Sequence, residues 1–141
     1  AVKYLKNKNQ ILQVGNLDAV RDWGHARDYV ENMWVMLQKK TPDDYVIATN
    51  RSYTVRKFIE ETYKALGINL KWIGKGDKEK AIDIKTKKII IKVNSKYFRP
   101  NEVDNLRGNP QKAKKVLNWK PKINLKQLIK EMIDYEIESQ G

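Results

Sequence analysis

The 141-residue chain carries 29 Lys and Arg against 17 Asp and Glu, a formal net charge of +12, and its 40% hydrophobic share is enough for a core. Having no Cys and one His excludes disulfides, Cys-based metal sites and clusters of His ligands. Without an apolar run of about 18 residues or a signal-peptide pattern at its start, we expect one cytoplasmic domain over residues 1–141 and no membrane span.

The first half of the chain predicts a helix stub followed by two strands that alternate with two helices. Val2 and Leu5 have the spacing of a helix stub, and the apolar run 11–14 predicts a strand. A loop then leads to a helix from about His25 to Lys39 and Lys40, whose cations suit a C-terminal end. Residues 45–48 predict a short buried strand. Ser52 or Thr54 can cap the next helix, and Gly67 ends it; one face of that helix is apolar (Val55, Phe58, Ile59, Thr62, Tyr63, Leu66).

The second half predicts a small β-structure followed by two helices. Residues 70–73 alternate as a strand, 74–78 form a turn, and 81–93 form a hairpin or a loose loop. Asn109 caps a short helix with Pro110 at its first position, and residues 118–121 break it. The last helix follows Asn124 as cap and has one apolar face (Leu125, Leu128, Ile129, Met132, Ile133, Ile137).

The positive charge has two interpretations. A polyanion such as nucleic acid could be the partner, or the surface could simply be rich in Lys. The Lys residues are spread along the whole chain, and no basic arm, RNP, KH or zinc-finger pattern occurs. We therefore favour the lysine-rich surface and do not expect a nucleic-acid partner.

Two loops combine an Arg with aromatic residues. Arg21 lies in the loop after the first strand, next to Trp23, and Arg99 follows Tyr97 and Phe98. A strand–loop–helix passage with a Gly at the exit is where α/β proteins bind ligands, and a guanidinium can donate two hydrogen bonds to one phosphate. The alternative role for each Arg is a salt bridge between two loops, and the pattern by itself does not decide between them.

The residues of the first loop resemble a known family. The stretch 15–30 reads Gly-Asn-Leu-Asp-Ala-x-Arg-Asp-Trp-Gly-His-Ala-x-Asp-Tyr-Val. It resembles the corresponding segment of GDP-mannose 4,6-dehydratases, which are nucleotide-sugar enzymes of the extended short-chain dehydrogenase/reductase superfamily. Later stretches match in the same order (42–49, 97–104, 108–113, 117–121). The resemblance covers nearly the whole chain but corresponds to the C-terminal third to half of such an enzyme.

The resemblance implies an α/β fold and a set of site residues. The chain would be the C-terminal substrate-binding part, with short strands and several packed helices, lacking the N-terminal Rossmann half. Matching Arg residues of the family lie against the GDP pyrophosphate and ribose, a Glu contacts the ribose, and small residues line the nucleotide. The implied substrate-binding set is Val14, Gly15, Asn16, Ala19, Arg21, Arg99 and Glu102. An alternative place for Glu102 is the first turn of a helix after Pro100. Asp22, His25 and Asp28 are implied to hold the loop to its helix.

The resemblance also implies a reaction and its limits. The family enzyme is an NADP-dependent lyase that converts GDP-mannose to GDP-4-keto-6-deoxymannose, a step of GDP-fucose biosynthesis. Its Tyr–Lys pair, Glu base and NADP loop belong to the half that this chain lacks, so we expect no catalytic, cofactor-binding or metal-binding residue here and no activity alone. The pair Tyr53 and Lys57 matches the family spacing by chance, and Gly74-x-Gly76 lacks the third Gly of a dinucleotide fingerprint.

Three functional alternatives remain open. The chain is part of a GDP-mannose 4,6-dehydratase, part of another nucleotide-sugar epimerase or reductase, or a non-enzymatic basic binding protein. For the first we expect GDP-mannose or GDP as ligand. We also expect self-association, or pairing with the missing half, through an exposed apolar patch formed by Met33, Trp34 and Met36 or by Val2 and Leu5.

Overall fold

A computed structural model describes residues 1–98, 103 and 105–139 of the chain. Its main sheet has four strands in the order β1-β6-β5-β4: β1 (Leu12–Val14), β6 (Ile89–Val93), β5 (Lys80–Asp83) and β4 (Leu70–Ile73). The pairs β4–β5 and β5–β6 are antiparallel, whereas β1 joins β6 in parallel, with Leu12 opposite Ile91. The sheet therefore combines a local meander with one strand from the beginning of the chain.

Three helices build the core beside this sheet: α1 (Val2–Lys6), α3 (Val55–Ala65) and α5 (Leu125–Ser139). Ile59 and Tyr63 of α3 and Tyr4 of α1 pack with Ala81 and Ile91 of the sheet. On its other side α3 contacts α5, where Leu125, Ile129 and Ile133 form a second cluster with Val2. The apolar residues that recur about every 3.6 positions in α3 and α5 are thus buried, and this burial stabilises the packing of both helices.

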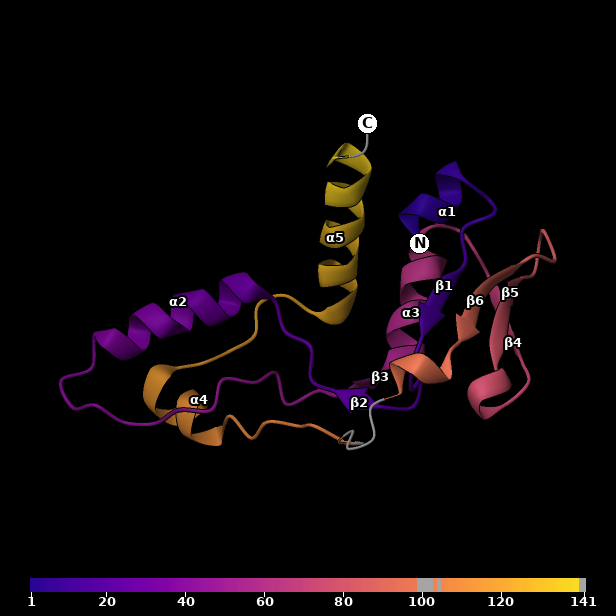
Figure 1. Cartoon of the computed structure of the whole chain (residues 1–141). Helices are drawn as coiled ribbons and strands as arrows, with labels where there is room; N and C mark the ends of the chain where they lie inside the picture. The colour runs from indigo at the N-terminus through magenta and orange to yellow at the C-terminus, as the bar shows by residue number, and fades with distance from the viewer. Residues whose placement is uncertain (99–102, 104, 140–141) are drawn as a thin grey trace.

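A third cluster lies at the opposite end of the molecule (Figure 1), where α2 (Ala26–Leu37) packs beside α4 (Gln111–Leu117). Ala113, Leu117 and Trp119 are buried there against Tyr29 and Met36. The remaining elements are short: β2 (Val20–Arg21) pairs with β3 (Tyr53–Thr54), and η1 (Gly76–Lys78) and η2 (Ser95–Tyr97) are single 3-10 turns. No helix in the described part of the chain is long and apolar enough to cross a membrane.

Most predicted elements are confirmed, including their caps. The Thr54 hydroxyl accepts a hydrogen bond from Lys57 N (3.0 Å), and the Asn124 side chain accepts one from Gln127 N (3.0 Å). The segment 81–93 is the hairpin β5–β6 rather than a loose loop. Asn109 accepts from Gln111 N (3.1 Å), as expected of a cap, although α4 is assigned from Gln111 and not from Pro110.

One predicted element, the strand over residues 45–48, is wrong. Residues 45–48 form no strand, although Ala48 is buried and Tyr45 and Ile47 pack against the α4 cluster. Val46 is 55% exposed, and the Ala48 carbonyl accepts a hydrogen bond from Trp119 Nε1 (2.7 Å). Apolar side chains of residues 45–48 therefore pack against the α4 cluster instead of forming a strand. This segment is not part of either sheet, because its backbone pairs with no strand.

Candidate functional site

The predicted ligand loop begins where β1 ends. The Val14 carbonyl accepts a hydrogen bond from Asn94 N (2.9 Å), and Val14 packs on the sheet cluster. A Cβ added at Gly15 would lie 2.4 Å from the Tyr97 carbonyl oxygen. Gly15 is therefore required by the close approach of η2, which holds the start of the 97–108 segment against the loop.

The middle of the loop rests on the first turn of α3. Val55 N donates to the Ala19 carbonyl (3.0 Å) and Arg56 N to the Leu17 carbonyl (2.9 Å), so the loop satisfies two amides that the helix leaves unpaired. Ala19 is 1% exposed and Leu17 is also buried. Asn16 stays near the surface, and its side chain accepts from Asp18 N (3.0 Å) in a local turn.

An ion-pair group fixes the loop to the sheet as well. Arg56 donates to Asp18 (Nη2–Oδ1, 3.0 Å) and to Glu79 (Nη1–Oε1, 2.5 Å), and its guanidinium lies 4.8 Å from the centre of the Trp72 ring. The hydrogen bond to Glu79 raises the pKa of Arg56 further above its ordinary value. Because Asp18 belongs to the loop and Glu79 precedes β5, Arg56 connects the loop with the main sheet.

Arg21 links the loop to the second predicted segment. Its Nη1 donates to the Val103 carbonyl (2.7 Å) and to the Val20 carbonyl (2.8 Å), and Leu106 N donates to the Val20 carbonyl (3.0 Å). Val103 and Leu106 thus lie beside the loop at Val20 and Arg21. The loop-bridging alternative for Arg21 is therefore realised in part, because Arg21 connects the loop to Val103 through that backbone carbonyl.

Asp22 anchors the connection that leads to β3. Its Oδ1 accepts from Thr49 N (3.1 Å) and from the Thr49 hydroxyl (2.5 Å), and its Oδ2 accepts from Asn50 N (2.9 Å). Asn50 has φ +62°, a left-handed conformation that Asn tolerates better than most residues. Its side chain accepts a hydrogen bond from Arg107 Nε (3.1 Å). These contacts give Asp22 a structural role.

His25 and Asp28 hold α2 in place. His25 Nδ1 accepts from Arg27 N (3.1 Å) at the helix start, and its Nε2 lies 3.2 Å from Glu131 of α5. Asp28 is buried, and its Oδ2 accepts from Lys122 N (2.9 Å) and Ile123 N (3.1 Å). Burial, followed by the nearby carboxylates, raises the pKa of Tyr29, so this phenol stays protonated near neutral pH.

Five of the predicted substrate residues lie on one continuous segment from the end of β1 to the end of β2: Val14, Gly15, Asn16, Ala19 and Arg21. Arg99 and Glu102 lie outside the described residues. Sequence reasoning missed Asn94, whose side chain donates to Gln13 Oε1 (2.6 Å) and whose amide holds Val14. An Asn directly before Ser95 was the available signal, because Asx side chains often cap such turns.

The cofactor-related patterns have other structural explanations. Gly74 and Gly76 have positive φ angles in the connection between the antiparallel strands β4 and β5, whereas a dinucleotide fingerprint connects a strand to an α-helix. This turn therefore does not fit an NADP site. Lys57 forms an ion pair with Glu61 (2.8 Å) one helical turn away. Among the described residues no group of three His, Cys, Asp or Glu could hold a metal ion.

Comparison with known proteins identifies the family. A family model described as GDP-mannose 4,6 dehydratase matches residues 1–132. The chain belongs to the GDP-mannose 4,6 dehydratase family. It is 50% identical over 131 residues to the GDP-mannose 4,6 dehydratase of Dictyostelium discoideum, covering 93% of this chain and 37% of that protein. The chain thus spans about a third of the length of the family member it matches.

Solved structures share the fold of this family member. The dTDP-glucose 4,6-dehydratase of Bacillus anthracis, in complex with NAD, superposes with a TM-score of 0.72 at 20% identity and covers 99% of this chain and 38% of its own. RMD from Pseudomonas aeruginosa, complexed with NADPH, gives 0.68 at 19% identity, with 94% and 38% covered. The predicted α/β fold, with short strands and several packed helices, is confirmed.

Proposed function

We propose that this chain is the nucleotide-sugar-binding part of an NADP-dependent GDP-mannose 4,6-dehydratase. The observation that carries the proposal is the family match over residues 1–132, which includes the whole of both predicted site segments. In this proposal the chain positions GDP-mannose, and the catalytic and cofactor-binding groups come from the part of the family that it does not span. The complete lyase would be cytoplasmic and would serve GDP-fucose biosynthesis.

The geometry supports a role in positioning. The loop 14–21 is fixed at three points, by Asn94 at its start, by the first turn of α3 in its middle and by Val103 at Arg21. A loop held in this way loses little conformational entropy when a ligand binds. We propose that Arg21 and Arg99 hold the pyrophosphate, that Glu102 accepts ribose hydroxyls and that the segment 14–19 lines the base.

The proposal predicts that GDP binds better than UDP and that the guanidinium of Arg99 donates two hydrogen bonds to a phosphate of GDP. Arg99→Ala should weaken GDP binding about tenfold to a hundredfold, because a charge-assisted bond to phosphate contributes about 1.5–3 kcal/mol. Arg99→Lys should recover part of the loss, since the ammonium keeps the charge without the fork. Calorimetric titration of the three proteins with GDP and then UDP measures both effects.

The other interpretations predict different titrations. A piece of another nucleotide-sugar enzyme would prefer UDP or dTDP to GDP. A generally basic surface would make Arg99→Lys nearly silent and would bind UDP and ATP as well as GDP. Equal affinities for GDP and UDP, together with no difference between wild type and Arg99→Lys, would contradict the proposal.

A further inference from the structure

Half of the net charge of this protein lies in one short part of the fold. Residues 71–96 contain nine Lys and three acidic residues, so this stretch of 26 residues carries six of the twelve net positive charges. It is the meander β4–β5–β6 with its two turns and η2. The expectation of evenly spread lysines, from which we expected no nucleic-acid partner, therefore understates how strongly the lysines are concentrated in this part of the fold.

The acidic residues of the meander do not compensate this charge on the surface. Glu79 is paired with Arg56, and Asp83 is buried and accepts hydrogen bonds from Tyr4, Thr86 and Lys85 N. Asp77 alone of the three is exposed. Among the described contacts, none of the nine lysines forms an ion pair with an acidic side chain.

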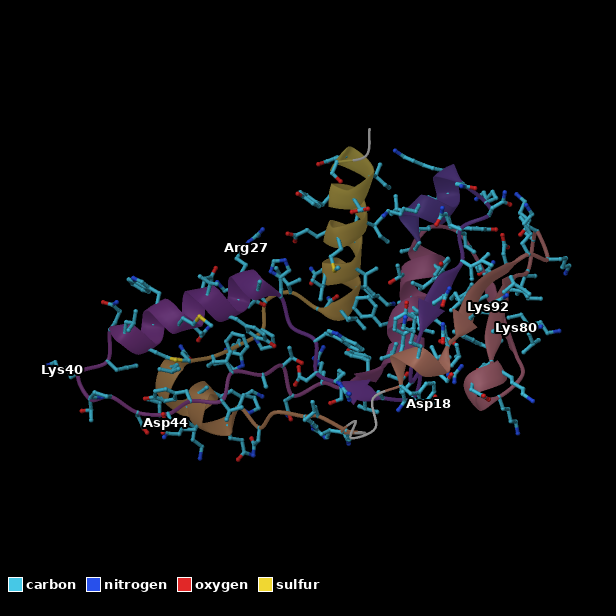
Figure 2. All side chains as sticks on the ribbon, viewed as in Figure 1. Asp18, Arg27, Lys40, Asp44, Lys80 and Lys92 are labelled. Atoms are coloured by element: carbon cyan, nitrogen blue, oxygen red, sulfur yellow. The ribbon has the colours of Figure 1, made fainter. Side chains whose placement is uncertain are left out.

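The strand register places the lysines on the face of the sheet that α1 and α3 leave open. Trp72 and Ala81 lie opposite each other and face α3, so their neighbours along the strands face the other way. Lys71 pairs with Ile82, Ile73 with Lys80, and Lys80 with Lys92. We call this surface, formed by Lys71, Ile73, Lys80, Ile82 and Lys92, the lysine face; Figure 2 shows Lys80 and Lys92 next to each other on it.

The direct opposition of Lys80 and Lys92 is unfavourable in the isolated chain. Like charges at opposed positions of neighbouring strands destabilise a sheet, and an anion placed between them would reverse this effect. Exposed lysines of the two turns extend the charge beyond the strands at both ends of the lysine face (Lys75, Lys78, Lys85, Lys87, Lys88). The surface thus resembles a broad positive field and not a pocket for one small anion.

The composition of the lysine face favours one kind of polyanion. Lys is depleted at protein–protein interfaces, whereas protein–nucleic acid interfaces are much more positive. A second copy of the chain would meet its own charge there. Single strands need aromatic platforms, but Trp72 faces α3, where its Nε1 donates to Glu60 (2.9 Å), and the exposed Tyr97 and Phe98 follow β6 and are not on the strands of the lysine face. Gln13 of β1 lies opposite Lys92, but its side-chain oxygen accepts a hydrogen bond from Asn94 (2.6 Å), and lysines recognise phosphates instead of base edges.

We propose that the lysine face binds the phosphate backbone of double-stranded nucleic acid without sequence preference. This function does not rest on the proposed nucleotide-sugar site, because the lysine face is formed by β4, β5 and β6 and includes no residue of the loop 14–21, although Lys92 lies opposite Gln13, which precedes that loop. Binding is expected to depend strongly on salt: if about four phosphates are contacted, the affinity should fall about a hundredfold between 50 and 200 mM salt.

The test uses fluorescence anisotropy of the 141-residue chain with a labelled 20-base-pair DNA duplex. Lys80→Glu creates a Glu–Lys pair with Lys92, so it should leave thermal stability unchanged or raise it, while weakening duplex binding about fivefold to tenfold. Lys92→Glu creates the reciprocal pair and should do the same. The matched control is Lys40→Glu, which changes the net charge equally at the opposite end of the molecule (Figure 2) and should change binding less than about twofold.

Three results would overturn the proposal. Lys80→Glu and Lys40→Glu could weaken binding equally, which would assign it to net charge alone. The wild-type chain could show no salt-dependent binding to the duplex. Polyglutamate could displace the duplex as well as unlabelled duplex does at equal charge concentration, which would assign the lysine face to acidic proteins. A loss confined to the two meander variants, with duplex preferred over polyglutamate, supports it.

Discussion

At the scale of single residues, the polar side chains of this protein mainly hold backbone segments together. Asp22 and Asp28 each accept hydrogen bonds from backbone amides of a distant segment. Asp83 accepts hydrogen bonds from Lys85 N and from the Tyr4 hydroxyl. The sequence alone suggested the role of the first two through a family resemblance. It gave no signal for Asp83, because its partner Tyr4 lies far away along the chain.

Asp83 gives a prediction about pH. Burial opposes its charge, but the hydrogen bonds from Lys85 N, Thr86 and Tyr4 outweigh it and hold the pKa of Asp83 below its ordinary value. A carboxylate with a lowered pKa stabilises the fold above the unfolded-state value, about 3.9, and loses this contribution as the pH falls through the folded-state value. Asp83→Asn should therefore cost about 1–3 kcal/mol of unfolding free energy at pH 7.

The stability gap between wild type and Asp83→Asn should stay constant down to about pH 5 and narrow below about pH 3.9. Urea denaturation at a series of pH values measures it. Asp77→Asn, which alters an exposed carboxylate of η1 in the same meander, serves as the control and should show a gap near zero at every pH. If the gap for Asp83→Asn did not change with pH, the ionised carboxylate of Asp83 would not be the stabilising form.

At the scale of elements, periodicity and caps predicted the helices and the hairpin, because both signals are local. The segment 45–48 was mispredicted because an apolar run does not state which surface will cover it, and α4 comes more than sixty residues later. The same limit applies to β2 and β3, which are two residues long and pair only because the loop and the turn at Asn50 bring them together.

The turn of the β5–β6 hairpin carries a local conflict. Lys87 has φ +60°, and its amide donates to the Asp83 carbonyl (2.8 Å). A left-handed conformation costs an L-residue about 1–2 kcal/mol, and Gly is free of this cost but loses more entropy on folding. Lys87→Gly should therefore stabilise the chain by about 0.5–1 kcal/mol.

Thermal and urea unfolding of Lys87→Gly measure this gain. Lys85→Gly is the matched control: it removes the same charge from the same turn, at a residue without a positive φ, and should destabilise by about 0.4–1 kcal/mol. If both variants shifted stability in the same direction, charge and not backbone conformation would explain the effect.

At the scale of the whole molecule, α2 leaves an apolar stripe uncovered. Val30, Met33, Trp34 and Leu37 recur at helical spacing and are 59–81% exposed. The predicted patch is thus correct for Met33 and Trp34. It is wrong for Met36, which faces the α4 cluster, and for Val2, which is buried against α5. Figure 1 shows that α2 and α4 form a thin end of the molecule, where few elements are available to cover the stripe.

Such a stripe predicts self-association of the isolated chain, or pairing with a chain that carries the rest of the family fold. Trp34→Glu combined with Leu37→Glu should abolish association and change the unfolding free energy by less than about 0.5 kcal/mol. Sedimentation at tens of micromolar protein measures the association. Tyr135→Glu, which places one negative charge at a 71% exposed aromatic of α5, should leave it intact. A wild-type chain that stays strictly monomeric would contradict the prediction.

The parallel pairing of β1 with β6 also has a consequence for the order of folding. The strands of the meander β4–β5–β6 are neighbours in sequence. Leu12 and Ile91, in contrast, can pair only when the chain between them, residues 13–90, closes into a loop. Closing a long loop costs entropy before any contact compensates it, and distant pairings slow folding. We therefore expect the meander to form early and β1 to join late. Because the ligand loop starts at the end of β1, the predicted binding loop would be among the last parts of the chain to become ordered.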